Sequence, residues 1–498
     1  MMAKLPIVYV RGFAGSGIEQ AVADPLYGFN EGSVHVRVGA GGDPIFYQFE
    51  GPLLRLHQDG GYETFVHGDQ MAYLRREPKV DPASIWIHRF YDVSASSLSK
   101  DPKEFRLEKA AEDLLDLIEL LQAKTRAPRV HLVAHSMGGL ICRCLIQKII
   151  PDRRPGRKAT EFVDRLFTYG TPHRGIAFDL GSHILGWLRD AGVEGADVFG
   201  ADRMYEYLTP AQRLRTDGEC PEGWDPARMT DAEFPLDRIC CLVGTDPEDY
   251  PTAHGLSALA VGPRSDGLVQ IENAYVPGAH RIVVHRSHSG PYGLVNSEEG
   301  YQNLQRFLFG DLQVRAELVG HRRPPEQDLD VVWQAEVRLS VRGVPVIQHE
   351  QTAGHWCPIQ LFDGPDGQPE PLAVTFLRSD RTPEKDQAAR FSLQLRLLSL
   401  RQRDGHLVFD HHLEHAADFD DTLIVDVRPC DGRLRVWTTW NSAIGRIATY
   451  RPQDLDAPTL PMDNPVRGTW IVHLPLPPAA EKILGNDARI KLTAIRRT

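Results

Sequence analysis

The chain has 498 residues, more than one hydrophobic core usually organises, so we expect two domains. With 42% hydrophobic and 25% charged residues, and with no low-complexity tract or internal repeat, it has the composition of a globular protein. The 56 lysines and arginines against 67 aspartates and glutamates give a net charge of -11, which disfavours nucleic acid as a partner.

The start of the chain carries one lysine and then a short apolar run that ends at Arg11. A secretory signal peptide has a longer apolar stretch and a small-residue cleavage site, and neither occurs here. No run of about 18 apolar residues is found, so no membrane span is expected. A cytoplasmic location is the default expectation, with secretion by another route left open.

The seven cysteines are scattered, and their odd number and spacing indicate neither a disulfide framework nor a zinc ribbon. They are Cys142, Cys144, Cys220, Cys240, Cys241, Cys357 and Cys430.

From residue 5 to about residue 310, apolar runs typical of buried strands alternate with helical patterns. This alternation predicts an α/β domain over residues 1–310, with a mostly parallel sheet flanked by helices. Strands are expected at 5–10, 84–88, 130–134, 165–169, 238–243 and 281–284, and helices at 102–123 and 137–150. The segment from about 22 to 82 is long for a connection between neighbouring strands, so it is expected to hold a hairpin or small subdomain near the site.

Both helices carry recognisable boundary signals. Asp101 is suited to cap the first helix, Pro102 suits its first turn and Glu104 completes a capping-box spacing. The second helix is expected to stop at Pro151. One apolar face of the first helix follows the i, i+4, i+7 pattern through Leu107, Ala111, Leu114, Ile118 and Leu121.

The pattern changes after residue 310. From 311 to 498, short runs of alternating apolar and polar residues are separated by turn clusters at 363–367 and 404–405. The clearest runs lie at 331–341, 391–400, 423–427 and 433–440. They predict a second, accessory domain built as an antiparallel β-sandwich or barrel.

The main chemical signal is Val133-Ala134-His135-Ser136-Met137-Gly138-Gly139-Leu140, in which a strand delivers Ser136 to a tight turn and a helix follows at once. The small residues two positions before and after the serine, Ala134 and Gly138, allow backbone segments to approach closely in such a turn. The helix would direct its N-terminal amides toward the hydroxyl, where negative charge develops during acyl transfer. A chance strand-turn-helix with a small-residue turn is the plainer alternative.

This string resembles the nucleophile elbow of bacterial lipases and esterases of the α/β-hydrolase superfamily, with Ala134 where the common pattern has glycine. The resemblance covers residues 5 to 310 and includes relatives that deacylate lipid anchors. It implies an oxyanion hole made by the N–H groups of Phe13 and Met137. Arg11 stands where these enzymes usually carry histidine, which leaves the backbone donor of Phe13 in place. An ordinary Gly-rich turn or a weak phosphate loop is the alternative for residues 8–15.

The acid and the histidine are expected after the serine in chain order. Ser265-Asp266-Gly267-Leu268-Val269 is close to the acid motif of the lipase family, which makes Asp266 the expected acid, with Asp246, Glu248 and Asp249 as rivals. His288 follows the last strand of the sheet and is the expected base, with His285 as its competitor. The string 296–301 fits a final helix behind this loop.

Several further residues are candidates for the substrate pocket. His135 precedes the nucleophile, and His173 lies in a Gly-Thr-Pro-His-x-Gly stretch similar to that of the same lipases, as a pocket-wall or loop-fixing residue. The segment 176–237 is long enough for a cap, and its apolar helix face includes Trp187 and Leu188. A helix packed on the core is an equally open alternative to a moving lid.

We expect no cofactor and no metal. The lipase family sometimes carries calcium near the acid and histidine loops, but the residues immediately after His288 lack the carboxylate this would need. The His-rich string 410–415 reads better as a solvated loop than as a metal site, because adjacent histidines on a strand point to opposite faces.

The sequence thus predicts a serine carboxylester hydrolase that acts on a lipid or other acyl ester through a Ser-Asp-His triad and an acyl-enzyme. Peripheral contact with lipid is compatible with this substrate, and no partner is indicated for the accessory domain. An acyltransferase, or an amide or thioester hydrolase, could use the same triad. A binding protein with a hydrolase-derived domain is the third alternative.

Overall fold

The structure is a computed structural model. It describes residues 4–12, 33–38, 44–49, 51–65, 69–88, 106–176, 196–248, 262–290, 293–323, 331–363, 367–378, 389–403, 406–407, 417–430, 433–444 and 468–497. The chain forms two compact units, one of Met1–Arg281 with His285–Leu304 and one of Ile282–Val284 with Gln305–Thr498. The chain passes to the second unit after Leu304, whereas the sequence predicts a boundary at residue 310.

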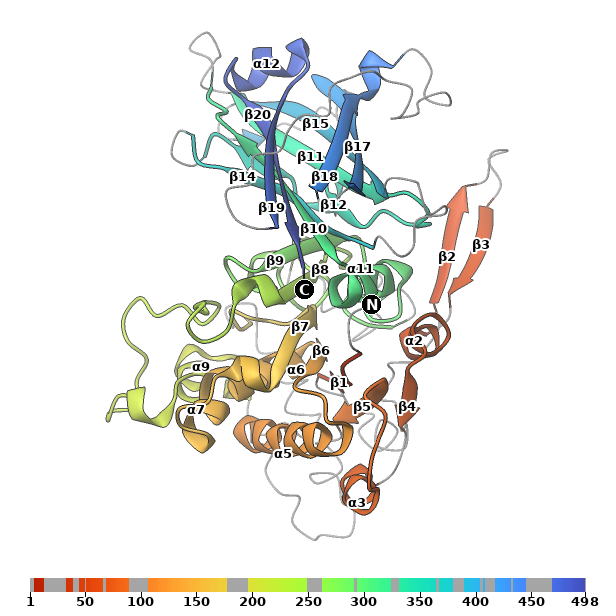
Figure 1. Cartoon of the computed structure of the whole chain (residues 1–498). Helices are drawn as coiled ribbons and strands as arrows, with labels where there is room; N and C mark the ends of the chain where they lie inside the picture. Colours follow the sequence, from red (N-terminus) through yellow and green to blue (C-terminus); the bar gives the residue numbers. More distant parts are fainter. Residues whose placement is uncertain are drawn as a thin grey trace. The chain divides into compact units, whose positions relative to one another are not determined.

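The first unit is built on a seven-stranded sheet (Figure 1). All five pairings from the β4 edge to β8 are parallel, so the carboxyl ends of these strands meet at one edge of the sheet. This confirms the predicted α/β class. The strand order is β4 (Glu63–Phe65), β5 (Ser84–His88), β1 (Ile7–Val10), β6 (Val130–His135), β7 (Val163–Tyr169), β8 (Ile239–Gly244) and β9 (His280–Val284).

The central strands are apolar on both faces because both faces are covered. In β1, Val8 and Val10 join the core formed with helices α5 (Leu107–Thr125) and α6 (Met137–Cys144). The alternate residues Ile7 and Tyr9 point to the opposite face, and all four side chains are fully buried. Parallel sheets require this double burial, which explains why the strands read as continuous apolar runs in the sequence.

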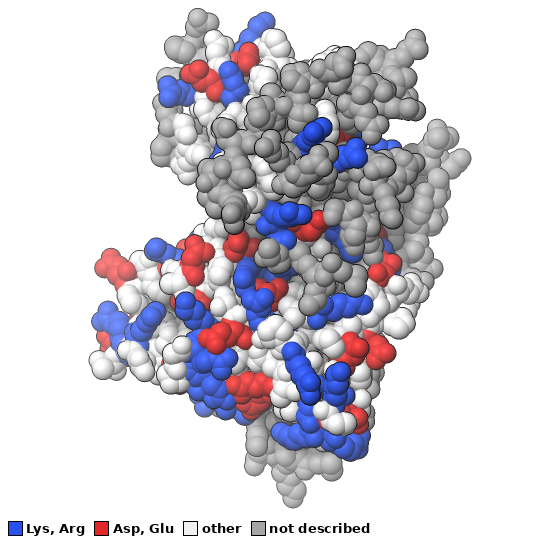
Figure 2. Space-filling model, in the orientation of Figure 1, with Lys and Arg blue, Asp and Glu red and all other residues white. Residues whose placement is uncertain are grey.

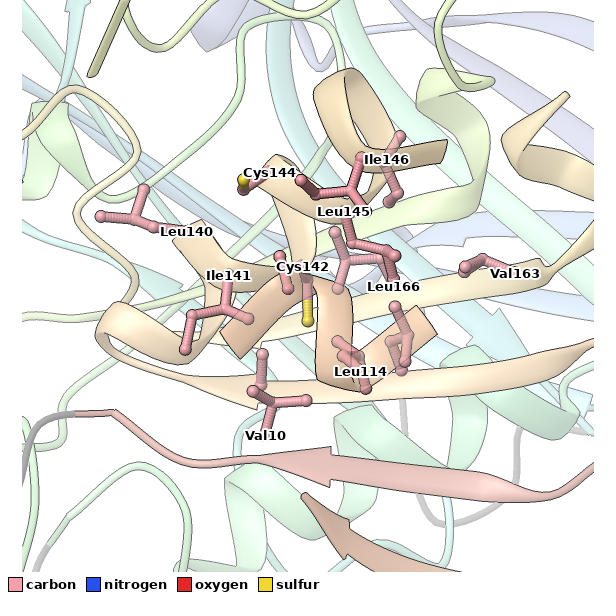
Figure 3. Packing of buried hydrophobic residues seen from close by; sticks show 14 of the residues in the cluster. Val10, Leu114, Leu140, Ile141, Cys142, Cys144, Leu145, Ile146, Val163 and Leu166 are labelled. Carbon is pink, nitrogen blue, oxygen red and sulfur yellow. The ribbon is translucent and has the colours of Figure 1, made fainter. Parts of the chain in front are cut away.

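Figure 3 shows the packing on the α5–α6 face, where Val10, Leu114, Ile141 and Leu166 bring together β1, α5, α6 and β7. Full burial of one such aliphatic side chain stabilises the fold by about 1.5–3 kcal/mol. The five apolar positions predicted for the first helix are all buried, as expected for its core-facing stripe. The capping residues expected for this helix, 101–104, lie outside the described residues.

On the opposite face, α2 (Pro52–Gly60) is tied to α11 (Glu298–Phe309) by polar side chains. The guanidinium of Arg55 binds the carboxylate of Glu298 and lies 4.1 Å from the ring centre of Tyr301. The hydroxyl of Tyr301 donates to Asp59 at 2.8 Å. These contacts hold the two helices side by side as a second layer.

The helix after the elbow continues beyond its predicted stop. After α6, Leu145–Ile149 forms a π-helical turn in which the N–H of Ile150 binds the carbonyl of Leu145, five residues earlier. A last α-helical turn, α7 (Ile150–Arg153), follows, with Pro151 in its first positions. The prediction that Pro151 ends the helix is therefore wrong. Proline is tolerated here because it starts a new helical turn after a break in the regular hydrogen-bond ladder.

The insertion at 22–82 contains the expected hairpin, β2 (Ser33–Val38) paired antiparallel with β3 (Pro44–Phe49). It also contributes α2, the edge strand β4 and α3 (Gln70–Arg76). Asp69 caps α3 by accepting the N–H of Ala72 at 2.9 Å. Much of the insertion is thus part of the α/β layers.

The described part of the cap segment, 196–237, contains short helices, among them α9 (Ala201–Leu208). Met204 and Tyr207 of α9 are buried in the core cluster of the α5–α6 face. In its described residues this segment is therefore packed on the core. The apolar helix face with Trp187 and Leu188, which the lid prediction concerns, lies outside the described residues.

The second unit consists of two antiparallel sheets that share one apolar core. This confirms the predicted antiparallel architecture and identifies it as a sandwich. The first of these sheets has the strand order β14 (Glu370–Leu377), β10 (Leu312–Val319), β20 (Arg489–Arg496) and β19 (Thr469–Pro475). The second sheet has the strand order β12 (His349–Gln351), β11 (Val331–Val341), β15 (Ala389–Arg403), β17 (Phe419–Cys430) and β18 (Arg433–Trp440). Further elements are β13 (Ile359–Leu361), β16 (His406–Leu407) and α12 (Pro478–Leu484).

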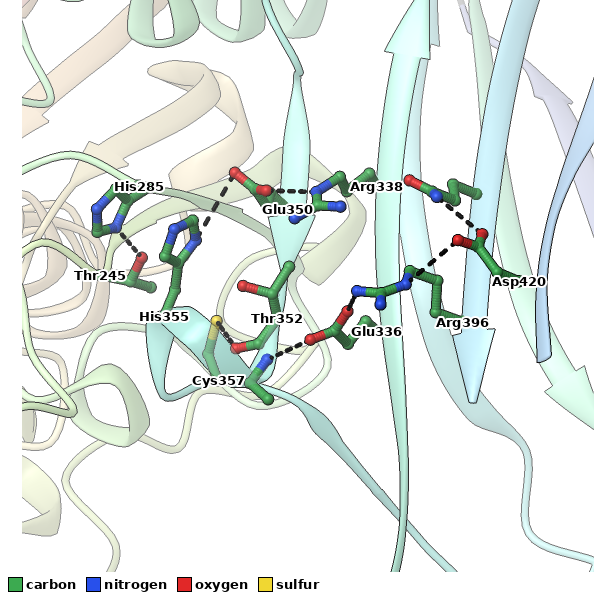
Figure 4. A network of polar contacts seen from close by, with 12 residues as sticks. Thr245, His285, Glu336, Arg338, Glu350, Thr352, His355, Cys357, Arg396 and Asp420 are labelled. Atoms are coloured by element: carbon green, nitrogen blue, oxygen red, sulfur yellow. Dashed lines mark hydrogen bonds and ion pairs between the residues drawn. The ribbon is translucent and has the colours of Figure 1, made fainter. Parts of the chain in front are cut away.

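Charged side chains cross the strands of the second sheet. Arg396 of β15 binds Glu336 of β11, and its Nε lies 3.4 Å from Asp420 of β17 (Figure 4). The second carboxylate oxygen of Glu336 accepts the N–H of Ala353 at 2.9 Å. Such cross-strand pairs each contribute about 0.2–1 kcal/mol to the register of a sheet.

On the face shown in Figure 2, basic and acidic side chains of the described residues are interspersed. Ion pairs among the described residues include Lys109 with Asp113 at 2.7 Å and Arg154 with Glu119 at 2.6 Å. Among the described residues, no helix is both long enough and apolar enough to traverse a lipid bilayer.

Candidate active site

Ser136 stands at a strained turn between β6 and α6. Its backbone has φ 54° and ψ -130°, a conformation that non-glycine residues rarely adopt and that costs on the order of 1–3 kcal/mol. Three hydrogen bonds hold the turn: the N–H of Ser136 donates to Tyr169 at 2.9 Å, and its carbonyl accepts from Thr171 Oγ1 at 2.9 Å and from the N–H of Gly139 at 3.0 Å. This is the strand-turn-helix geometry that the sequence predicts for a nucleophile elbow.

The turn leaves no room for a side chain at Gly138. A Cβ added there would lie 2.2 Å from the carbonyl oxygen of Val10, so α6 and the end of β1 are in backbone contact. This contact explains why a residue without a side chain stands two positions after the serine.

Of the two expected oxyanion donors, Met137 is described by the structure. The N–H of Met137 belongs to the first residue of α6, where the helix dipole is positive. Phe13 lies outside the described residues. Its predecessor Gly12 is beside the serine, since an ideal Cβ on Gly12 would be 3.1 Å from Ser136 Oγ. The end of β1 therefore comes next to Ser136, the expected nucleophile.

Asp266 and His288 form a buried pair. His288 Nδ1 lies 2.8 Å from Asp266 Oδ2, and the N–H of His288 donates to the carbonyl of Asp266, also at 2.8 Å. Asp266 is 1% and His288 2% exposed. The other carboxylate oxygen, Oδ1, accepts the N–H groups of Leu268 and Val269 at 3.1 and 2.8 Å. Both oxygens of Asp266 thus have hydrogen-bond partners.

The rival residues make other contacts. His285 Nδ1 lies 3.2 Å from Thr245 Oγ1 (Figure 4), and the side chain of Asp246 accepts the N–H of Glu248 at 3.0 Å. Asp249 lies outside the described residues. Of the predicted candidates, Asp266 and His288 make a carboxylate-imidazole contact at 2.8 Å.

The serine turn and the Asp-His pair meet at the end of β7. Tyr169, the last residue of β7, accepts the N–H of Ser136. The next residue, Gly170, has φ 50°, and a Cβ on it would lie 2.7 Å from Asp266 Oδ2 and 3.1 Å from His288 Nδ1. Gly170 is therefore required both by its backbone conformation and by the close approach of the pair. The three residues predicted from the sequence come from three loops at one edge of the sheet.

His135 is in contact with His288, the expected base. Its Nε2–H donates to the carbonyl of His288 at 2.9 Å, and the two ring centres are 4.8 Å apart. Burial, followed by the charges of His288 and Arg11, lowers the pKa of His135 well below its ordinary value. The sequence predicts His135 as a pocket residue, and the structure shows a polar contact that this prediction did not include.

His173 is fully buried behind the elbow. Its Nε2 lies 3.1 Å from Thr168 Oγ1 and 3.6 Å from the sulfur of Cys241, and burial lowers its pKa well below the ordinary value. Its carbonyl accepts from Arg143 at 2.9 Å. These contacts fit the loop-fixing interpretation. The other two expected pocket residues, Trp187 and Leu188, lie outside the described residues.

Arg143 is a buried residue on the helix after the elbow, and the sequence did not predict a role for it. Its guanidinium donates to Gln147 Oε1, to the carbonyl of His173 and to the carbonyl of Arg228, at 2.9, 2.9 and 3.2 Å. Burial lowers its pKa to about 10. It fastens α6 to two loops, and no local pattern distinguishes it from a surface arginine.

Within the described ranges, no group of three or more histidine, cysteine, aspartate or glutamate side chains is arranged to hold a metal ion. The string 410–415 lies outside these ranges.

No protein-family model and no curated protein matches the chain. Among solved structures, it is similar to a lipase of Bacillus licheniformis in mature form, with 16% identity, coverage of 61% of this chain and 91% of that one, and a TM-score of 0.31. It is similar to a structure from Nitrososphaera gargenis described among carboxylesterases, with 14% identity, 61% and 90% coverage and a TM-score of 0.23. A third is Aspergillus fumigatus lipase B, with 12% identity, 60% and 51% coverage and a TM-score of 0.27. Similarity at this level of identity and TM-score carries no argument about function, so a function for this chain has to be argued from its site residues.

Proposed function

We propose that the protein is a serine carboxylester hydrolase that acts on lipid or other acyl esters through Ser136, His288 and Asp266. The observation that carries the proposal is the buried contact between His288 Nδ1 and Asp266 Oδ2, located beside the strained serine turn. A carboxylate-imidazole pair next to a strained serine turn is the arrangement by which proteins activate a serine for acyl transfer.

The tautomer of His288 supports this role. An ionised carboxylate only accepts hydrogen bonds, so the proton of the neutral imidazole is on Nδ1, facing Asp266. Nε2 then carries a lone pair and is the atom able to take the proton of the serine hydroxyl. Asp266 holds the ring in this tautomer and stabilises the imidazolium once it forms.

The proposed reaction has two halves. Ser136 Oγ attacks the acyl carbonyl as His288 Nε2 takes its proton, and the N–H groups of Met137 and Phe13 bind the oxyanion of the tetrahedral intermediate. Each such donor is worth on the order of 3 kcal/mol in the transition state. His288 then protonates the departing alcohol. In the second half, a water molecule deprotonated by His288 attacks the acyl-enzyme, releases the carboxylic acid and restores Ser136.

The test is hydrolysis of para-nitrophenyl esters of graded acyl length by the full chain. Ser136→Ala should reduce turnover to background, while Ser399→Ala, which alters an exposed serine of the sandwich, should leave it unchanged. A fluorophosphonate should label Ser136, identified by mass spectrometry of the labelled peptide. The profile over acyl length then reports whether long, lipid-like chains are preferred.

Other outcomes separate the alternatives. A rate that rises with added alcohol or amine acceptors indicates acyl transfer, and turnover of thioester or anilide substrates alone indicates a different leaving group. An absence of turnover and of labelling with every substrate contradicts the proposal and favours a binding role.

A further inference from the structure

The histidine that precedes the nucleophile contacts the proposed base through a group that the mechanism does not otherwise use. His135 is the last residue of β6, and Ser136 follows it directly. A carbonyl oxygen can only accept, so the 2.9 Å contact between His135 Nε2 and the carbonyl of His288 requires a proton on His135 Nε2.

We propose that His135 is a positioning residue that fixes the loop of His288 relative to Ser136. This inference rests on the proposed function and identifies a further residue on which the same site depends.

His288 is held by hydrogen bonds to Asp266 and to His135. Asp266 binds it twice, through the backbone N–H and through Nδ1, both at 2.8 Å. Both bonds come from Asp266, so they orient the ring relative to that residue and do not by themselves fix its place relative to the serine. The bond from His135 to the carbonyl of His288 comes from the strand that precedes Ser136. This contact therefore ties the proposed base directly to the elbow.

This contact also fixes the position of His288 relative to the serine. His135 and Ser136 are consecutive residues, so a group bound by His135 keeps a nearly constant distance from Ser136. Proton transfer between hydroxyl and imidazole requires heavy atoms within hydrogen-bond reach, and a displacement of about 1 Å reduces a rate on the order of 100-fold.

His135 also has to remain neutral for the site to work. The rings of His135 and His288 are 4.8 Å apart, and His288 becomes positive during each half-reaction. A second positive ring at this distance would oppose that change. Burial is the largest cause that lowers the pKa of His135, and the charges of His288, on the loop after β9, and of Arg11, after β1, act in the same direction. The hydrogen bond to the carbonyl of His288 acts in the opposite direction. Arg11 thus adds a permanent positive charge to the effect of burial.

Two substitutions in the full-length protein separate the hydrogen bond from the bulk of the ring. His135→Met removes the donor and keeps an apolar side chain of similar size. His135→Gln keeps an N–H donor at about the distance of Nε2 from the backbone. His473→Met, at an exposed position of β19, is the matched control.

We expect His135→Met to reduce kcat by about 10- to 100-fold with KM changed by less than about twofold, and to slow fluorophosphonate labelling of Ser136 in parallel. His135→Gln should recover most of this loss, and the control should equal the wild type. Equal loss in the methionine and glutamine variants, or wild-type kcat in His135→Met, overturns the inference. A purely structural role would lower the melting temperature of both variants and raise KM together with the fall in kcat.

A measurement on the unsubstituted protein keeps the inference testable even if a variant fails to fold. Long-range 1H–15N spectra of the 20 histidines, recorded from about pH 5 to pH 8, should show a ring locked as the neutral Nε2–H tautomer whose signals are absent from His135→Gln. An Nδ1–H tautomer or protonation of His135 in this range refutes the inference. If the wild type hydrolyses no ester, the proposed function fails while the tautomer of His135 still decides whether the contact exists.

Discussion

Replacement of Asp266 by asparagine is the substitution that most directly tests the proposed triad, because the surroundings of the carboxylate dictate how the amide must lie. Oδ1 accepts two backbone N–H groups, from Leu268 and Val269. In Asp266→Asn the amide oxygen has to take this place, since an NH2 group there would face two donors. The NH2 group is then directed at His288 Nδ1, where Oδ2 stands in the native protein.

This orientation inverts the tautomer of His288. The amide N–H donates to Nδ1, so the imidazole proton moves to Nε2, and Nε2 can no longer accept the proton of Ser136. In serine proteases the corresponding change lowers kcat by about 10⁴, which is about 5.5 kcal/mol in the activation free energy. We expect a loss of the same order here, with KM nearly unchanged and with folding stability altered by less than about 2 kcal/mol, because the shape and the loop bonds are retained.

The assay is steady-state hydrolysis of a short para-nitrophenyl ester together with thermal unfolding. Asp266→Ala is the informative partner, since it removes the acceptor of two buried N–H groups and should cost about 2–4 kcal/mol of stability in addition to activity. Asp246→Asn is the control at the rival position, with kcat expected within about threefold of the wild type. Activity of Asp266→Asn within tenfold of the wild type, or a larger loss in Asp246→Asn, would refute the assignment of the acid.

Three further predictions concern stability. Gly138→Ala would place a Cβ 2.2 Å from the carbonyl of Val10 and should lower the free energy of unfolding in urea by about 3 kcal/mol or more, whereas Gly354→Ala, with open space around it, should not. Arg143→Met leaves the carbonyls of two loops without their buried donor and should cost about 3 kcal/mol by the same measurement, and a loss below about 1 kcal/mol would contradict its role. Burial lowers the pKa of His88 to about 4, so the unfolded chain binds a proton that the folded chain does not as the pH falls from about 6.5 to 4. Stability should fall by up to about 3 kcal/mol over this window, and a slope unchanged in His88→Gln would show that another group is responsible.

The strands of the sheet could be predicted closely because their burial leaves a simple pattern. A strand covered on both faces has to be apolar at every position, and the run at 130–134 corresponds to β6, Val130–His135. The sandwich strands alternate instead, since one face is solvated, and the runs at 331–341 and 433–440 match β11 and β18. Burial acts on each position independently, so it can be inferred from local sequence.

The continuation of the helix through Pro151 could not be predicted in the same way. Local rules treat a proline as the end of a helix because its N–H is missing and its ring meets a carbonyl of the preceding turn. The π-helical turn at 145–149 shifts the hydrogen bonds so that Ile150 pairs five residues back. Whether a helix adopts such a turn depends on its packing against other elements, which the local sequence does not contain.

The residues of the candidate site also differ in whether local sequence is enough to predict them. Ser136 could be identified because the elbow is a local structure, and its small neighbours answer a local steric demand. Asp266 and His288 followed from chain order and a resembling motif, while the choice of Asp266 over Asp246 needed spatial information. Both aspartates come after β8, but Asp266 contacts His288 Nδ1 at 2.8 Å, whereas the side chain of Asp246 accepts the N–H of Glu248 at 3.0 Å.

The residues that support the elbow cannot be predicted from local sequence patterns, and the reason is physical. A strained serine costs on the order of 1–3 kcal/mol, and each hydrogen bond that opposes relaxation contributes about 1 kcal/mol. Two of the bonds at Ser136 come from Tyr169 and Thr171, on the next strand and its loop, and the third comes from Gly139. The strain is therefore balanced mainly by a neighbouring element more than 30 residues away, and the elbow is stable only when β7 is already beside β6. A serine with the same local sequence but without that neighbour would relax to an ordinary turn, so the elbow motif specifies a nucleophile only as part of the assembled sheet.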